Sequence, residues 1–176
     1  IKPNRSFSGY HGYWPIEPRK IDERFGKEED FHNLVEIAHS KNIKVVLDFV
    51  SNHVHQDHIY FQDHEDWFGD FYLSDGNPNI RLWDGETMLT TWFDEFLPSF
   101  DFSNNIEAIN QVTEDALWWV KKYNIDGFRQ DAVKHVPHSF WKKLTKKIKN
   151  KFPNKDFYQI GETFGSDELI ASYVNP

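Results

Sequence analysis

Cysteine is absent from the 176-residue chain, which excludes disulfide bonds, thiolate metal sites and cysteine nucleophiles. Basic residues are fewer than acidic ones, and the net charge of −8 argues against a nucleic-acid partner, because phosphate binding needs a basic surface. No apolar run approaches the length of a membrane span, so none is expected in this segment. Exported bacterial proteins also manage without cysteine, so the compartment stays open, with an extracellular, cell-surface or periplasmic bacterial location favoured over the cytoplasm.

Glycine-rich phosphate loops are also missing after the predicted strands, so we set aside a nucleotide-binding protein. We expect no organic cofactor. The first residues carry neither a start methionine nor a basic-then-apolar signal sequence, and the last ones show no terminal element. The chain is therefore expected to be an internal segment of a larger domain.

Helix and strand patterns alternate along the chain, which predicts an α/β fold with a parallel sheet. Apolar residues at helical spacing predict helices, the second of them capped by Asn104 or Asn105. Nearly continuous apolar runs predict buried parallel strands. The predicted helices are 28–41, 106–123 and 137–151, and the predicted strands are 43–50, 125–130 and 157–161.

A long segment without a clear period, at about 51–104, separates the first predicted strand from the second predicted helix. It is dense in Asp, His, Gly and aromatic residues. An insertion of this kind after the carboxyl end of a strand is typical of a functional subdomain on a barrel. Aromatic residues make up 17% of the chain, which suits a sugar-binding cleft, although aromatics also fill cores.

Two carboxylates stand at the ends of predicted strands. Residues two apart on a strand share a face, so Arg129 should project beside Asp131, lower its pKa and keep it ionised as a nucleophile. Glu162 follows an apolar run with no cation next to it in sequence, so partial burial should raise its pKa. One charged carboxylate and one that holds a proton is what retaining glycoside hydrolysis needs. The alternative is a salt-bridged strand end and an unrelated glutamate.

Polar residues follow all three predicted strands, where parallel barrels place catalytic groups. With two motifs near the start of the chain, they resemble the α-amylase family of glycoside hydrolases, also called family 13. The motifs are Gly9–Trp14, Ile21–Gly26, Asp48–His53, Gly127–His135 and Gly161–Phe164. The resemblance implies part of a (β/α)8 TIM barrel, about strands 3 to 5, with a loop-rich subdomain inserted after strand 3. It divides the chain into a barrel segment at 1–50, an inserted subdomain B at 51–104 and a second barrel segment at 105–176.

The resemblance also assigns catalytic roles. Asp131 would be the nucleophile, Glu162 the acid and then the base, and Arg129 the group that keeps Asp131 ionised. Asp48 would have a structural hydrogen-bonding role rather than a catalytic one. The family's third carboxylate belongs to an Asn-His-Asp triplet, and no such triplet follows Glu162. These 176 residues alone are therefore expected to be nearly inactive.

Substrate contacts are implied on both sides of the bond to be cleaved. His53 would hydrogen-bond the sugar beside that bond, and Tyr13 would stack beneath it. The donor side would be lined by His11 and Trp14, and the acceptor side by Lys134 and His135. The Lys-His pair resembles enzymes that act on α-1,4 linkages more than the oligo-1,6-glucosidase branch.

Calcium is the metal that the resemblance implies, with Asn52 and the main-chain carbonyl of His135 as ligands. In the motif Leu97–Asp101, however, the family usually has a calcium-binding aspartate where this chain has Ser99. A neutral hydroxyl is a much poorer ligand for a hard cation than a carboxylate is. Calcium is therefore the one metal that the resemblance implies, and Ser99 puts its binding in doubt.

The leading hypothesis is a retaining hydrolase that cleaves α-1,4-glucosidic bonds in starch, maltodextrins or related α-glucans. One alternative is an α-glucan transglycosylase, and another is a non-catalytic carbohydrate-binding relative. Individual residues also have simpler readings, in which Tyr13 and Trp14 pack in the core and Lys134 is a solvated lysine. Four histidines of the inserted segment could instead form a transition-metal patch. They are His53, His55, His58 and His64.

Overall fold

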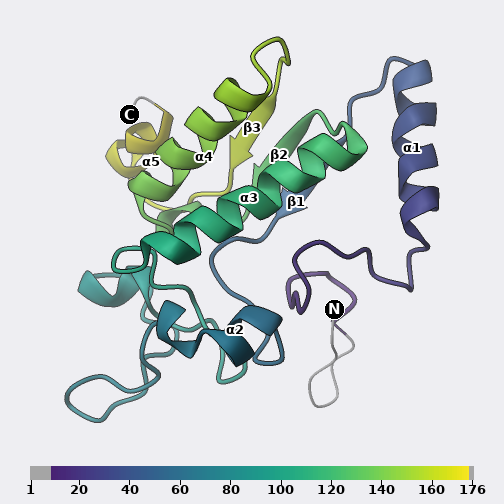
Figure 1. Ribbon diagram of the computed structural model, residues 1–176. Helices are drawn as coiled ribbons and strands as arrows, with labels where there is room; N and C mark the ends of the chain where they lie inside the picture. Colours follow the sequence, from purple (N-terminus) through teal and green to yellow (C-terminus); the bar gives the residue numbers. More distant parts are fainter. Residues whose placement is uncertain (1–8, 175–176) are drawn as a thin grey trace.

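A computed structural model describes residues 9–174 of the chain (Figure 1). Helices and strands alternate around a small sheet, as the sequence predicted. The helices are α1 (Glu28–Ser40), α2 (Ile59–Asp63), α3 (Ile106–Tyr123), α4 (His138–Lys151) and α5 (Asp167–Val174), and the strands are β1 (Val46–Phe49), β2 (Gly127–Gln130) and β3 (Tyr158–Gly161). Short 3-10 helices complete the set: η1 (Glu65–Trp67), η2 (Glu86–Leu89) and η3 (Val133–His135).

The three strands form one parallel sheet in chain order, which confirms the predicted topology. In the register, Asp48 of β1 lies opposite Arg129 of β2, and Gln130 lies opposite Gly161 of β3. Gly127 permits the close approach of β3, because a Cβ there would lie 2.4 Å from the carbonyl oxygen of Tyr158. The carboxyl ends of the strands consequently meet at one edge of the sheet.

The strands are shorter and less buried than the apolar runs predicted. β1 covers only part of the predicted strand 43–50, and its first residue, Val46, is 40% exposed. In β3, Ile160 is 47% exposed. Within residues 9–174, β1 and β3 are the outer strands of the sheet, and only one of its faces is covered by helices. The apolar side chains on the other face therefore reach solvent in this segment, whereas the barrel that the sequence predicts would enclose that face.

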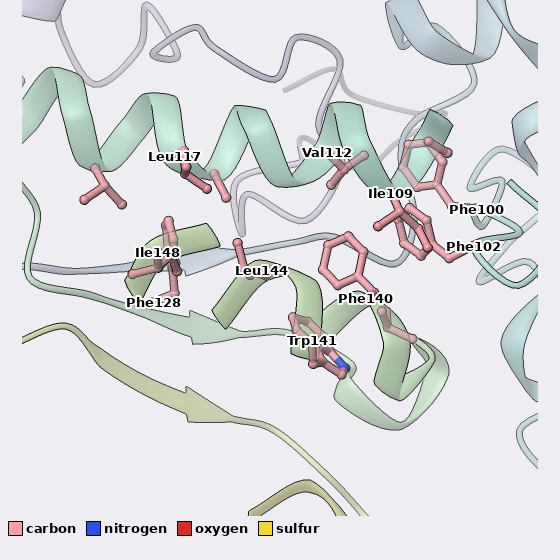
Figure 2. Packing of buried hydrophobic residues seen from close by; sticks show 14 of the residues in the cluster. Phe100, Phe102, Ile109, Val112, Leu117, Phe128, Phe140, Trp141, Leu144 and Ile148 are labelled. Carbon is pink, nitrogen blue, oxygen red and sulfur yellow. The ribbon is translucent and has the colours of Figure 1, made fainter. Parts of the chain in front are cut away.

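The hydrophobic core lies between the sheet and helices α3 and α4. Phe128 of β2 is fully buried there, and Figure 2 shows it beside Ile148 of α4. The same figure shows Val112 and Leu117 of α3 facing this core. Each such side chain contributes about 1.5–3 kcal/mol when it leaves water, so this layer fixes the helices against the sheet.

The ends of the helices differ in places from the prediction. α1 ends at Ser40, one residue before the predicted end. Asn105 occupies the position before α3, but its side chain donates to the carbonyl of Asp66 instead of capping the helix, with an Nδ2–O distance of 3.0 Å. α5 was not predicted from the sequence. Among residues 9–174, no helix has the length and apolar character needed to cross a bilayer.

The segment between β1 and α3 is rich in loops, with only α2, η1 and η2 as helices (Figure 1). Its last part, 98–100, lies between two other stretches of backbone. On one side, Val54 N donates to Pro98 O over 3.1 Å, and on the other, Gly69 N donates to Ser99 O over 3.0 Å. The segment thus folds back onto the end of β1. Its division from the barrel at residues 51 and 104 stays a prediction.

Candidate active site

The candidate catalytic residues come from the carboxyl ends of the three strands. Asp48 lies in β1 and Arg129 in β2, while Asp131 and Glu162 directly follow β2 and β3. Because alternate residues of a strand point to opposite faces, Arg129 lies on the face opposite to buried Phe128. The helices cover the Phe128 side, so the open face of the sheet is left for the polar groups.

Arg129 binds three carboxylates at once. Its Nη1 lies 2.8 Å from Asp48 Oδ1 and 2.5 Å from Asp131 Oδ1, and its Nη2 lies 2.8 Å from Glu162 Oε2. The predicted contact between Arg129 and Asp131 is present. The two candidate catalytic carboxylates therefore bind the two terminal nitrogens of one guanidinium.

The expected lowering of the Asp131 pKa is not found. Burial of this carboxyl group raises its pKa to about 6, against the opposing effect of the Arg129 guanidinium. The negative charges of Glu162 and Asp48 add to the rise. The prediction considered only the adjacent cation. The burial of Asp131, which the sequence does not show, has the larger effect on its pKa. Asp131 is ionised mainly above pH 6 rather than throughout the acid range.

Glu162 was expected in partly buried surroundings without a cation. Its side chain is 36% exposed and forms the ion pair with Arg129 described above. The cation comes from the neighbouring strand, whose Arg129 stands opposite Ile160 in the register. Arg129 and Glu162 are 33 residues apart in the sequence, so their ion pair could not be predicted from neighbouring residues. The parallel pairing of β2 and β3 brings the two side chains together.

Tyr13 extends the same network. Its hydroxyl donates to Asp48 Oδ2 over 2.8 Å, and this hydrogen bond to a carboxylate raises the Tyr13 pKa. The Arg129 guanidinium lies 5.9 Å from the centre of the Tyr13 ring. Asp48 thus links Tyr13 to Arg129, which agrees with the structural hydrogen-bonding role predicted for it.

The other two aromatic candidates near the start of the chain lie around Tyr13. The imidazole of His11 stacks on its ring with centroids 5.6 Å apart. Trp14 contacts Phe96 of the inserted segment edge to face, with centroids 5.1 Å apart. Neither Tyr13 nor Trp14 is fully buried, so core packing alone does not account for them.

His53 is buried at the end of the β1 loop. Its Nε2 lies 3.1 Å from the carbonyl oxygen of Tyr13, and its ring stacks on Phe93 with centroids 4.5 Å apart. Burial lowers the His53 pKa to about 4, so the imidazole is neutral near pH 7. Its Nε2 donates to that carbonyl, and its Nδ1 lies 3.5 Å from Asn52 Nδ2, so a sugar that binds His53 must share or replace one of these contacts.

The histidines of the inserted segment do not gather as a metal patch. His58 accepts a hydrogen bond from Tyr60 N at the start of α2, and His64 stacks on Trp67. Over residues 9–174, no group of three or more His, Asp or Glu side chains could hold a metal ion. The transition-metal alternative is therefore without structural support.

Lys134 and His135 lie in η3, directly after Asp131. His135 is buried, which lowers its pKa, and its Nδ1 lies 3.0 Å from the carbonyl oxygen of Met88. Lys134 Nζ lies 4.0 Å from Asp84 Oδ1. Both residues therefore contact the η2 region of the inserted segment, which brings that segment to the edge of the site.

A family model described as the α-amylase catalytic domain matches residues 3–176. The chain belongs to the α-amylase family. The fold is part of that family's TIM barrel.

Individual relatives agree with this family. The chain is 33% identical to α-amylase 3 of Dictyoglomus thermophilum, over 93% of the chain and 35% of that protein. It is 30% identical to the cyclomaltodextrin glucanotransferase of Niallia circulans, over 96% of the chain and 24% of that protein. The crystal structure of the Geobacillus thermoleovorans α-amylase with acarbose superposes with a TM-score of 0.80 and 36% identity, covering 97% of the chain and 37% of that structure. The chain thus spans about a third of the length of these amylases.

The sequence did not single out two aromatic residues that the fold adds to this part of the α-amylase domain. Trp83 and Phe93 both make edge contacts with the His135 ring, at centroid distances of 5.3 and 5.2 Å. Phe93 also supports His53, as described above. They lie in a segment without secondary-structure period, so only the folded structure brings them to the strand ends.

The residues of the calcium site implied by the α-amylase family do not fit a hard cation. Asn52 and Ser99 are both buried, and Asn52 Nδ2 donates to Ser99 Oγ over 3.2 Å. Calcium binds oxygen ligands that usually include carboxylates. The side chains of Asn52 and Ser99 and the carbonyl of His135 supply none. These three groups therefore offer a calcium ion only neutral oxygen atoms.

Proposed function

We propose that the protein carrying this chain is a retaining glycoside hydrolase that cleaves α-1,4-glucosidic bonds in starch, maltodextrins or related α-glucans. The observation that carries this proposal is the binding of Asp131 and Glu162 to the two ends of the Arg129 guanidinium. Retaining glycosidases need two carboxyl groups about 5–5.5 Å apart on either side of the scissile bond. Two carboxylates that share one guanidinium are well placed for that spacing.

In the first step, a carboxylate oxygen of Asp131 attacks the anomeric carbon of the bound sugar. The bond from that carbon to the glycosidic oxygen breaks as the new ester bond forms. Glu162 gives its proton to the departing oxygen, so the leaving sugar ends with a neutral hydroxyl. The Glu162 carboxyl group also forms an ion pair with Arg129, which holds it beside Asp131.

In the second step, the Glu162 carboxylate removes a proton from a water molecule, which attacks the same anomeric carbon. The ester bond to Asp131 breaks and the sugar is released with its original α configuration. Arg129 remains beside Asp131 through both steps. Its positive charge stabilises the carboxylate as the leaving group of the second step.

The remaining predicted contacts surround this pair. We assign Tyr13 to stacking beneath the sugar, with His11 and Trp14 on the donor side. His53, neutral because it is buried, is assigned a hydrogen bond to the same sugar. Lys134 and His135, next to Asp131 in the chain, are assigned to the acceptor side.

A transglycosylase is the second candidate, and the similarity to cyclomaltodextrin glucanotransferases favours it. In that reaction a sugar hydroxyl instead of water attacks the glycosyl ester. Asp131 and Glu162 would act in the same way up to that point, so the two candidates differ only in the acceptor. The non-catalytic alternative is less favoured, because Asp131, Glu162 and Arg129 are all present and in contact.

The test is product analysis of the intact protein with maltoheptaose. Hydrolysis gives only shorter linear oligosaccharides, whereas larger or cyclic products would establish transglycosylation. Proton NMR of the first product should show the α anomer before mutarotation, and a β anomer would rule out double displacement. No conversion by the folded, intact protein would favour the carbohydrate-binding alternative. These 176 residues by themselves are expected to be nearly inactive, because the triplet with the third carboxylate is not among them.

A further inference from the structure

The inserted segment meets the barrel at a junction of two stretches of chain. We define the junction as residues 52–54 and 98–100. The two stretches run antiparallel, with a bridge between His53 and Ser99. Phe100 N donates to Asn52 O over 2.9 Å, and Val54 N donates to Pro98 O over 3.1 Å. These backbone hydrogen bonds join the two stretches directly.

The side chains in the junction complete this arrangement without a charge. Asn52 is 1% and Ser99 0% exposed, and the amide of Asn52 donates to the hydroxyl of Ser99. A buried amide and hydroxyl that bond to each other satisfy part of their hydrogen-bonding capacity, which removes much of the cost of burying them. The contact lies where the family resemblance places a calcium ion and its aspartate.

Two carboxylates close to Ser99 in the sequence are engaged elsewhere. Asp101 accepts hydrogen bonds from the backbone and side-chain nitrogens of Asn104, at 3.2 and 2.7 Å. Asp94 forms an ion pair with Arg81, with an Nη2–Oδ2 distance of 2.7 Å. Neither is therefore available to replace the missing carboxylate at position 99. A dication bound by Asn52, Ser99 and the carbonyl of His135 would have neutral ligands only.

We propose that this junction keeps its structure without calcium, with the Asn52–Ser99 hydrogen bond in the place of the ion. Ser99 determines whether the junction needs calcium, because an aspartate at the same buried position would need a cation to offset its charge. Stability of the inserted segment therefore does not depend on calcium in this protein. The family's usual aspartate would restore that dependence.

The experiment compares the melting temperature of the intact protein in excess EDTA with that in millimolar calcium. For the unchanged protein we expect the same value in both. Ser99→Asp should melt below Ser99→Asn in EDTA, because only the aspartate buries a charge. Calcium should raise the melting temperature of Ser99→Asp by several degrees and leave that of Ser99→Asn unchanged. If Ser99→Asp folds poorly, its refolding yield with and without calcium is the readout.

Two outcomes would overturn the proposal. The first is a calcium-dependent rise in the melting temperature of the unchanged protein that disappears in Asn52→Ala, which would place an ion at the junction. A rise that survives in Asn52→Ala would come from an ion elsewhere and agrees with the proposal. The second is a Ser99→Asp variant that folds without calcium and does not respond to it, because position 99 would then not be the determinant.

Discussion

Phe128 and Arg129 are neighbours on β2, yet they belong to two different regions of the molecule. Phe128 is 0% exposed and packs under α3 and α4, while Arg129 projects from the other face and binds three carboxylates. The alternation of a strand thus divides one short segment between stability and chemistry. Substitutions at these adjacent residues should therefore change stability and catalysis separately.

The largest effect is expected from Asp131→Asn on the chemical face. The amide cannot form the glycosyl ester, so kcat on maltoheptaose should fall by about 10⁴-fold or more. The melting temperature should change little, because burial already disfavours the charged form of Asp131. Both values are measured in the intact protein.

Asp48→Asn is the matched control for that variant. It removes another carboxylate from the same guanidinium, at a more exposed position that makes no bond to the sugar. The loss should be far smaller than for Asp131→Asn. Equal losses would mean that Arg129 needs all its partners and that Asp131 has no special role, while an active Asp131→Asn would favour the non-catalytic reading.

Glu162→Gln should lower the rate on maltoheptaose by about 10³-fold, because the amide cannot protonate the glycosidic oxygen. On an α-maltosyl fluoride the leaving group needs no proton, so formation of the glycosyl ester should be much less affected. Single-turnover measurements on both substrates check this difference. If both substrates slowed equally, Glu162 would be placing the sugar and not acting as the acid.

Much of the fold was predictable because it follows from local patterns. The alternation of helices and strands fixed the parallel order of β1, β2 and β3, and the helical apolar stripe located α3. The extent of burial was not predictable, because it depends on what covers each face of the sheet. Val46 and Ile160 are exposed in this three-stranded segment, on the face that a closed barrel encloses.

The candidate site was predictable in its members but not in its electrostatics. The spacing of Arg129 and Asp131 gave their contact, since the two share a strand face. It could not give the burial that raises the Asp131 pKa, nor the ion pair of Glu162 with Arg129. Trp83 and Phe93 lie in a loop-rich segment, where no periodicity indicates what a side chain will contact.

On the stabilising face, Phe128→Ala should lower the free energy of unfolding by about 3 kcal/mol or more, because it leaves a cavity in the core. Below its melting temperature, the variant should keep most of its kcat. Denaturant unfolding and kcat at low temperature measure the two effects. A Phe128 variant that is stable but inactive would show that the two faces are coupled.

The smallest effect is expected from Arg129→Lys, which keeps the charge but not the fork that contacts Asp131 and Glu162 together. The guanidinium lowers the Asp131 pKa against the effect of burial, so weakening the contact should raise that pKa above about 6. Asp131 must be ionised to attack, and the wild-type kcat/KM should therefore fall as the pH drops through about 6.

The fall in kcat/KM at low pH is the acid limb of the pH profile. In Arg129→Lys this limb should move to higher pH by about one unit, which corresponds to about 1.4 kcal/mol. The pH dependence of kcat/KM measures the shift directly. Arg19→Lys makes the same replacement in an ion pair with Asp115 on α3 and should leave the limb in place. A limb that stays near its wild-type position in Arg129→Lys would mean that a point charge is sufficient, or that another group sets the acid limb. A limb that moves to lower pH would contradict the proposed role of Arg129.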